Sequence, residues 1–208
     1  MNAGEVKHPG LNLGSTDTDT HEQAEGDVFG FWVFLMSDAV IFALLFAVYG
    51  TMLAATAGGP TPADAYKLGP TFAETLTLLT SSLTFGMASI AVKYEASGSV
   101  LFGWLAITLA LGLAFLGLEL HDFATMIGEG AYPARSGFLS SFFALVPLHG
   151  LHVLAGCLWL VVMIVQLSTF GLDARVKINL LRLGLFWHFL DIVWIAIFSI
   201  VYLQGLIR

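Results

Sequence analysis

The sequence predicts an all-α fold, an integral membrane bundle of five transmembrane helices. Of the 208 residues, 57% are hydrophobic and only 11% are charged, whereas about a quarter of a soluble domain is charged. Five apolar stretches reach the length of about 20 residues that a helix needs to cross a bilayer. None of them alternates apolar and polar residues, as the strands of a membrane barrel would. The five predicted spans are residues 28–53, 72–92, 100–120, 138–170 and 178–206.

The segment before the first span differs in composition from the rest of the chain. Residues 1–27 carry six acidic side chains against one lysine, so they hold −5 of the net charge of −7. Secretory signals begin with a basic region, and transit peptides are basic and poor in acids. A polar segment with few apolar residues favours disorder. We therefore expect a mostly disordered, acidic cytoplasmic leader (1–27) and one transmembrane domain (28–208). The acidic charge also argues against binding to nucleic acid.

Positive residues at the ends of the spans indicate the orientation of the bundle. An odd number of spans places the two termini on opposite sides of the membrane. The side of the N-terminus would hold five lysines and arginines and the other side three, and positive residues favour the cytoplasm. We expect a cytoplasmic N-terminus and an external C-terminus. The five are Lys7, Lys93, Arg175, Lys177 and Arg182, and the three are Lys67, Arg135 and Arg208.

Residues that break or cap helices separate the spans. The segment from Gly58 to Pro62 contains two glycines and two prolines, and it ends the first span because neither residue type favours a continuous helix. Ser136, just before the fourth span, is a predicted N-cap, since its hydroxyl can accept a hydrogen bond from the first turn. Cys157, the one cysteine, lies inside the fourth span and cannot form an intrachain disulfide. We expect it to be a small apolar residue of the helix packing.

Three carboxylates inside the spans are candidate proton-linked or interface residues: Asp38, Glu74 and Glu119. Ionisable groups at this depth are costly and mark functional sites. Asp38 lies deep in the first span and either handles protons, contacts another subunit, or is a hydrogen-bonded structural carboxyl. Glu74 begins the second span and could instead reach the lipid headgroups. Glu119 shares its helix face with Asp122, three residues later, and the two could form a cluster at the membrane interface.

Three histidines and an aspartate in the last two spans predict a polar packing seam. His149 and His152 are three residues apart, and so are His188 and Asp191, so each pair shares a helix face. The pairs could hold one small metal ion or form hydrogen bonds between helices. The chain has no thiolate cluster, and we favour a structural network that joins the fourth and fifth spans, with Asp191 holding His188. We predict no catalytic residue and no metal or cofactor bound by this chain.

Four segments of the chain resemble subunit III of the haem–copper oxidases. They are Phe29–Asp38 (FGFWVFLMSD), Ser136–Leu145 (SGFLSSFFAL), His149–Val153 (HGLHV) and Phe186–Trp194 (FWHFLDIVW). The resemblance covers nearly everything after the leader, and the last two motifs together are specific to the family. The commoner cytochrome c oxidase form has seven spans, of which the first two are missing here. The five-span form is therefore most similar to subunit III of cytochrome bo-type ubiquinol oxidases.

The resemblance implies an accessory, non-catalytic subunit of a respiratory oxidoreductase complex in the bacterial inner membrane. Such a subunit packs mainly against subunit I, which holds the haems and copper, and the complex also contains subunits II and IV. It stabilises subunit I, retains phospholipid and supports proton uptake, while the complex oxidises ubiquinol, reduces oxygen and pumps protons. Asp38 falls where seven-span members have a carbodiimide-reactive glutamate. The implied role of the polar seam is structural.

Three alternatives remain open from the sequence. The chain could be subunit III of a five-span cytochrome c oxidase, or the related accessory protein of a nitric-oxide reductase. From a different class, it could be a stand-alone small transporter or proton channel. A transporter needs a polar route through its own bundle, and the polar residues of this sequence are scattered.

Overall fold

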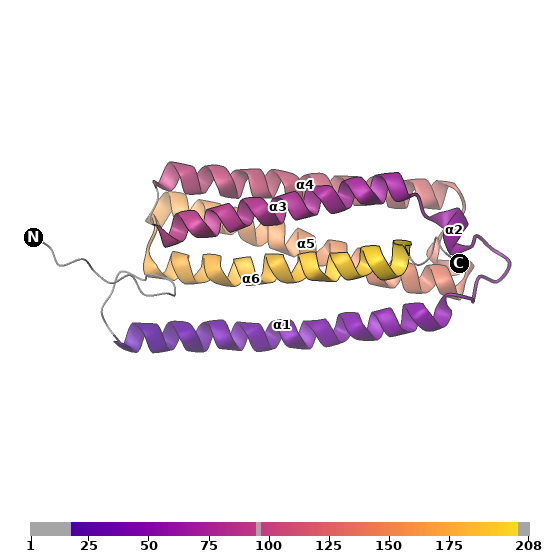
Figure 1. The fold of residues 1–208 in the computed structure, drawn as a ribbon, viewed down its shortest axis with the longest axis horizontal. Coiled ribbons are helices and arrows are strands. Elements are labelled where there is room, and N and C mark those ends of the chain that lie inside the picture. The colour runs from indigo at the N-terminus through magenta and orange to yellow at the C-terminus, as the bar shows by residue number, and fades with distance from the viewer. Residues whose placement is uncertain (1–17, 95–96, 204–208) are drawn as a thin grey trace, which may run out of the picture.

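The computed structural model describes residues 18–94 and 97–203, and within them five helices are long and apolar enough to cross a membrane. This confirms the predicted all-α fold of five membrane helices, which lie side by side in Figure 1. The helices are α1 (Thr18–Met52), α2 (Pro62–Ala65), α3 (Leu68–Lys93), α4 (Gly98–Gly128), α5 (Gly137–Phe170) and α6 (Ala174–Ile197), with a 3₁₀ turn η1 (Pro133–Arg135) and a π-helix η2 (Phe198–Leu203).

The helices extend further than the apolar stretches alone predict. Helix α1 begins at Thr18, so residues 18–27 are helical where we expected part of a disordered leader. Residues 1–17 of that leader lie outside the described residues. Helix α4 continues to Gly128, beyond the predicted end at residue 120. Hydropathy predicts only the part of a helix that lies in lipid, and extending an existing helix costs far less than starting one.

The helices do not all occupy equivalent places in the bundle. Helix α6 packs against α1, α3 and α5, while α4 packs against α3 and α5. Figure 1 shows α6 between α1 and α3, with α1 at one edge of the bundle. The polar side chains of α6 therefore have neighbours on several helices. The main neighbours of α1 are only α5 and α6.

Small residues let α4, α5 and α6 approach closely around Trp187. A Cβ atom added to Gly112 of α4 would lie 2.9 Å from Sγ of Cys157 and 2.9 Å from the Trp187 ring. Cys157 is buried and carries a free thiol. Trp187 also donates a hydrogen bond from Nε1 to Oγ of Ser81 in α3, at 3.0 Å. Close backbone approach at small residues is the usual basis of helix packing in membranes.

The predicted cap of α5 is confirmed. Ser136 is the N-cap residue, and its Oγ accepts a hydrogen bond of 3.2 Å from the backbone N–H of Leu139. The bond satisfies one of the free amide groups at the start of the helix. It also sets where α5 begins and therefore the depth of His149 and His152, which follow on the same helix.

Candidate functional site: polar contacts between the membrane helices

Asp38 of α1 lies against His152 of α5. Oδ2 of Asp38 is 3.1 Å from Nε2 of His152, and the Asp38 side chain is 9% exposed. On the other side of the ring, Nδ1 donates a hydrogen bond to the carbonyl oxygen of Leu148, at 2.7 Å. The two residues thus form a close carboxylate–imidazole pair that connects two helices.

His149 joins α5 to α6 from the interior of the bundle. Its side chain is completely buried, and Nε2 donates a hydrogen bond of 3.2 Å to the backbone carbonyl of Leu190. The ring lies 5.1 Å from that of Trp194 and edge-on to Phe115. The ring therefore links α5 and α6 through a hydrogen bond and aromatic packing in the interior of the bundle.

His188 and Asp191 of α6 face α3. Nδ1 of His188 lies 2.8 Å from Oγ of Ser82 and 3.5 Å from Oδ2 of Asp191. The Asp191 side chain is 6% exposed, but that of His188 is 45% exposed. The structure thus brings together the two residues that the helix spacing placed on one face, and it adds Ser82 as a third member.

The four residues of the predicted seam therefore lie at three different helix interfaces. His149 connects α5 with α6, as the prediction placed it. His152 instead points to α1, and the His188–Asp191 pair contacts α3. The sequence could place each residue on a helix face, but it did not indicate which neighbouring helix that face meets.

Glu74, Glu119 and Asp122 gather between α3 and α4. Glu74 is 1% exposed and Glu119 is 3% exposed, so neither reaches solvent or headgroups from its position in the structure. Glu119 interacts electrostatically with both Glu74 and Asp122. It also lies against α5, since a Cβ atom added to Gly150 would be 2.2 Å from Oε2 of Glu119. A glycine at position 150 is therefore required for this carboxylate to fit.

This carboxylate cluster is only partly predictable from local residue spacing. The spacing of Glu119 and Asp122 shows that they share a face of α4. The addition of Glu74 depends on how α3 packs on α4, which no local pattern reveals. At the end of the cluster, Lys67 and Glu129 form an ion pair in which both side chains are about half exposed.

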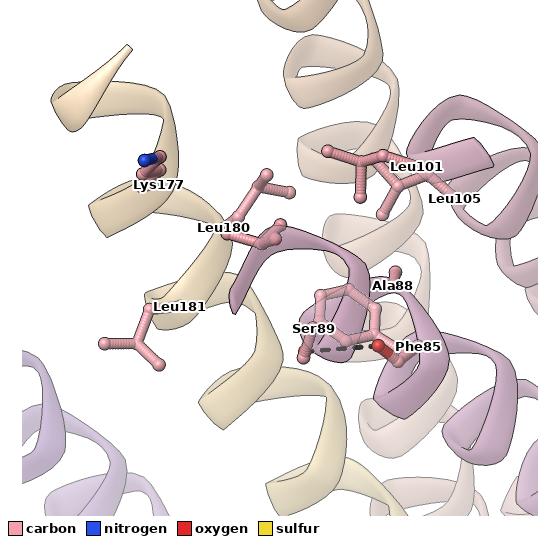
Figure 2. Close-up of a pocket in the computed structure, with 9 residues that line it drawn as sticks. Phe85, Ala88, Ser89, Leu101, Leu105, Lys177, Leu180 and Leu181 are labelled. Atoms are coloured by element: carbon pink, nitrogen blue, oxygen red, sulfur yellow. Dashed lines mark hydrogen bonds between the residues drawn. The ribbon is translucent and has the colours of Figure 1, made fainter. Parts of the chain in front are cut away.

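A small cavity opens between α3, α4 and α6. Figure 2 shows Phe85 and Ser89 of α3, Leu101 and Leu105 of α4, and Lys177 of α6 around it. Its volume is about 30 Å³, enough for about one water molecule. The walls are mostly apolar, and Oγ of Ser89 is bonded to the Phe85 carbonyl at 3.2 Å. Lys177, which is buried, lies at one end of this cavity.

Two larger cavities lie at opposite ends of the helices. One of about 480 Å³ is lined by Phe102 of α4 and Leu167 of α5, among others. The other, also about 480 Å³, lies between Phe72 of α3 and Phe198 and Leu203 of η2. Both have the size of ligand sites and predominantly apolar walls. Among the described residues, no three His, Cys, Asp or Glu side chains are grouped so as to hold a metal ion.

Comparison with known proteins places the chain in a family. The family model for cytochrome c oxidase subunit III matches residues 13–206. The cytochrome bo(3) ubiquinol oxidase subunit 3 of Pseudomonas aeruginosa is 47% identical over 93% of this chain and 92% of that protein. The protein of the same name from Pseudomonas putida is 44% identical over 90% of both chains. The cytochrome c oxidase subunit 3 of Alkalihalophilus pseudofirmus is 39% identical over 85% of both chains.

The family match and the geometry agree. The five membrane helices and the buried polar contacts between them occupy the same region of the chain as the match. The resemblance first indicated by the histidine and aspartate motifs is thereby confirmed over nearly the whole sequence. This multi-pass membrane protein belongs to the cytochrome c oxidase subunit III family.

Proposed function

We propose that the chain is the non-catalytic subunit III of a proton-pumping ubiquinol oxidase in a bacterial inner membrane. The observation that carries the proposal is its similarity, at 44–47% identity, to two proteins named as subunit 3 of ubiquinol oxidases. The match covers at least nine-tenths of both chains in each case, so it extends to all five spans. The complex would oxidise ubiquinol and reduce oxygen to water, with its haems and copper in the partner subunit I.

The packing role of this subunit follows from its polar contacts. Histidines 149, 152 and 188 each connect two helices through a side-chain contact. Hydrogen bonds between membrane helices stabilise a bundle by roughly 0.6–1.7 kcal/mol each. A rigid bundle of this kind would support subunit I and, with it, subunits II and IV.

The Asp38–His152 pair is the candidate for a role in proton uptake. Oδ2 of Asp38 lies 3.1 Å from Nε2 of His152, whose other ring nitrogen is bonded to the Leu148 carbonyl. A carboxylate next to an imidazole can hold and release a proton with small movements of either side chain. Glu74 and Glu119 are weaker candidates for a role in proton uptake, because their described contacts include no base.

The apolar cavities support a role in lipid retention. The cavity of about 480 Å³ lined by Phe102 of α4 and Leu167 of α5 has predominantly apolar walls. Its size is that of a ligand site, and its walls suit a hydrocarbon chain. With the proposed orientation, it lies at the cytoplasmic end of the bundle, where it would hold part of a phospholipid acyl chain. The C-terminus would then lie on the periplasmic side.

Purification of the tagged chain in mild detergent tests the proposed function. We expect a complex with haem absorption that consumes oxygen with ubiquinol as donor. Oxygen consumption with cytochrome c instead of ubiquinol would favour the alternative represented by the Alkalihalophilus protein. Isolation of the chain alone from intact membranes, without any haem protein, would contradict the proposal.

A comparison of Asp38→Ala with Ser37→Ala tests the proton role separately. Ser37 is exposed and bonds only its own helix, to the Phe34 carbonyl, so it is a matched control at the same depth. We expect Asp38→Ala to reduce sustained proton pumping or shorten the active lifetime of the complex more than it reduces the initial electron rate. Equal pumping, turnover and inactivation in Asp38→Ala and the parent would overturn this role.

A further inference from the structure

His188 carries a polar atom that the rest of this chain leaves exposed in the middle of the membrane. The residue is 14 positions from Ala174 and 15 from Leu203, the ends of the last membrane helix. At 1.5 Å per residue, it lies about 20 Å from either end. The side chain is 45% exposed at this depth, where the surrounding medium is hydrocarbon and offers no hydrogen bond.

The two nitrogen atoms of His188 have different surroundings. Nδ1 faces Ser82 and Asp191, at 2.8 and 3.5 Å. The Ser82 hydroxyl can donate to Nδ1 or accept from it, so Nδ1 has a polar partner inside the chain. The structure shows no partner for Nε2 within the described residues. A ring nitrogen left unpaired in hydrocarbon is costly, so its hydrogen-bond partner must come from outside this chain.

The residues around His188 on the surface of α6 are apolar. Leu181, Ile192 and Ile195 are 37%, 68% and 45% exposed, and their spacing from position 188 places all four residues on one helix face. We call these four residues the α6 stripe. The neighbours α1 and α3 both pack on α6 (Figure 1) without covering the stripe. His188 also lines none of the three cavities described above, which argues against a small ligand held within this chain.

We propose that the α6 stripe is the docking surface for one transmembrane helix of another oxidase subunit, which forms a hydrogen bond with Nε2 of His188 at mid-membrane. A hydroxyl or amide side chain on that helix supplies the partner, since each can donate or accept, and apolar side chains above and below it pack on Ile192 and Ile195. The inference rests on the proposed function, because the partner helix belongs to the oxidase complex. It assigns a contact surface that the family membership alone does not.

Substitutions at position 188 in the whole complex test the hydrogen bond. We expect His188→Leu to weaken retention of this chain by the haem-bearing fraction roughly threefold to tenfold in a detergent titration. His188→Gln keeps a side chain that can donate or accept a hydrogen bond and should recover a large part of that loss. The control is His121→Leu, which removes an exposed histidine near the end of α4. Retention of His188→Leu equal to that of the parent would overturn the proposal.

A crosslinking experiment identifies the occupant without altering His188. A photoreactive benzophenone amino acid replaces Ile192, and the complex is irradiated in native membranes. We expect an adduct with another subunit, at a membrane segment that carries a hydroxyl or amide side chain. Adducts with lipid or quinone alone would overturn the proposal. If no haem complex is recovered with the parent chain, the proposed function fails; if the complex is recovered but neither test responds, only this inference fails.

Discussion

Helix α6 lies among three other helices, whereas α1 lies at the edge of the bundle and packs mainly against two. In the most apolar 18-residue window of α6, 56% of the residues are buried inside the protein, compared with 17% for α1. Trp187, Trp194 and Ile197 of α6 are almost completely buried. The core of the bundle is therefore built around α6, and α1 contributes few side chains to it.

The comparison shows that the two helices depend on different interactions. Apolar side chains gain little from leaving lipid for protein, so packing density and polar contacts decide helix association in a membrane. Helix α6 has dense aromatic packing. Helix α1 has instead a few specific contacts: Asp38 with His152, Tyr49 with Tyr66 and the Val201 carbonyl, and Phe31 under the guanidinium group of Arg182.

The largest expected effect on stability comes from removing a buried tryptophan of α6, compared with an exposed tryptophan of α1. Trp194 is fully buried, and its Nε1 donates to Thr75 at 3.0 Å. We expect Trp194→Ala to lower the free energy of unfolding by about 3–5 kcal/mol, through loss of packing. Trp32→Ala in α1, where the side chain is 48% exposed, should change it by less than about 1 kcal/mol. Unfolding in a denaturing detergent measures both, and similar losses would contradict the comparison.

A double-mutant cycle tests the main polar contact of α1. We expect Asp38→Asn and His152→Gln each to destabilise the bundle, and the double variant to lose less than the sum of the two. The coupling free energy should be about 1 kcal/mol, because each single change leaves a buried polar group without its partner. The same unfolding assay provides the four values. Strict additivity would show that the contact does not stabilise α1.

The hydroxyl of Tyr49 is the second contact that we expect to hold α1. It lies 3.0 Å from the Tyr66 hydroxyl and 3.4 Å from the Val201 carbonyl. Tyr49→Phe should lower the free energy of unfolding by about 0.5–1.5 kcal/mol. Tyr132→Phe is a control, because that ring is 43% exposed just before η1. If Tyr49→Phe has no larger effect than the control, the Tyr49 hydroxyl does not stabilise the packing of α1.

The smallest expected effect is a pH dependence of stability that arises at Tyr66, the partner of Tyr49. Tyr66 precedes α3, and burial, with a smaller contribution from nearby Tyr49, raises the pKa of Tyr66 well above its usual value of 10. The unfolded chain therefore loses this proton first, so stability falls as pH rises above about 10 and does not depend on Tyr66 at lower pH. Tyr66→Phe should show a shallower fall in thermal stability between pH 9 and 11. An unchanged slope would contradict the prediction.

Several features of the candidate site followed from the sequence because they depend on local patterns. The helical spacing predicted that His188 and Asp191 meet, and they lie 3.5 Å apart. The hydroxyl of Ser136 predicted the cap of α5. Other contacts could not be predicted, because they join residues far apart in the chain. The partner of Asp38 is 114 positions away, and the partner of Nδ1 of His188 is 106 positions away.

The amino-acid sequence is sufficient to predict a chain that crosses a membrane five times as helices, because a helix long enough to span the bilayer satisfies its own backbone in lipid. It also shows which polar residues lie within the spans. Their partners are known only from the packed bundle: Asp38 with His152, Glu119 with Glu74, and His188 with Ser82. The helical repeat sets the direction of a side chain about its own helix axis, whereas the neighbour that it meets depends on how whole helices pack.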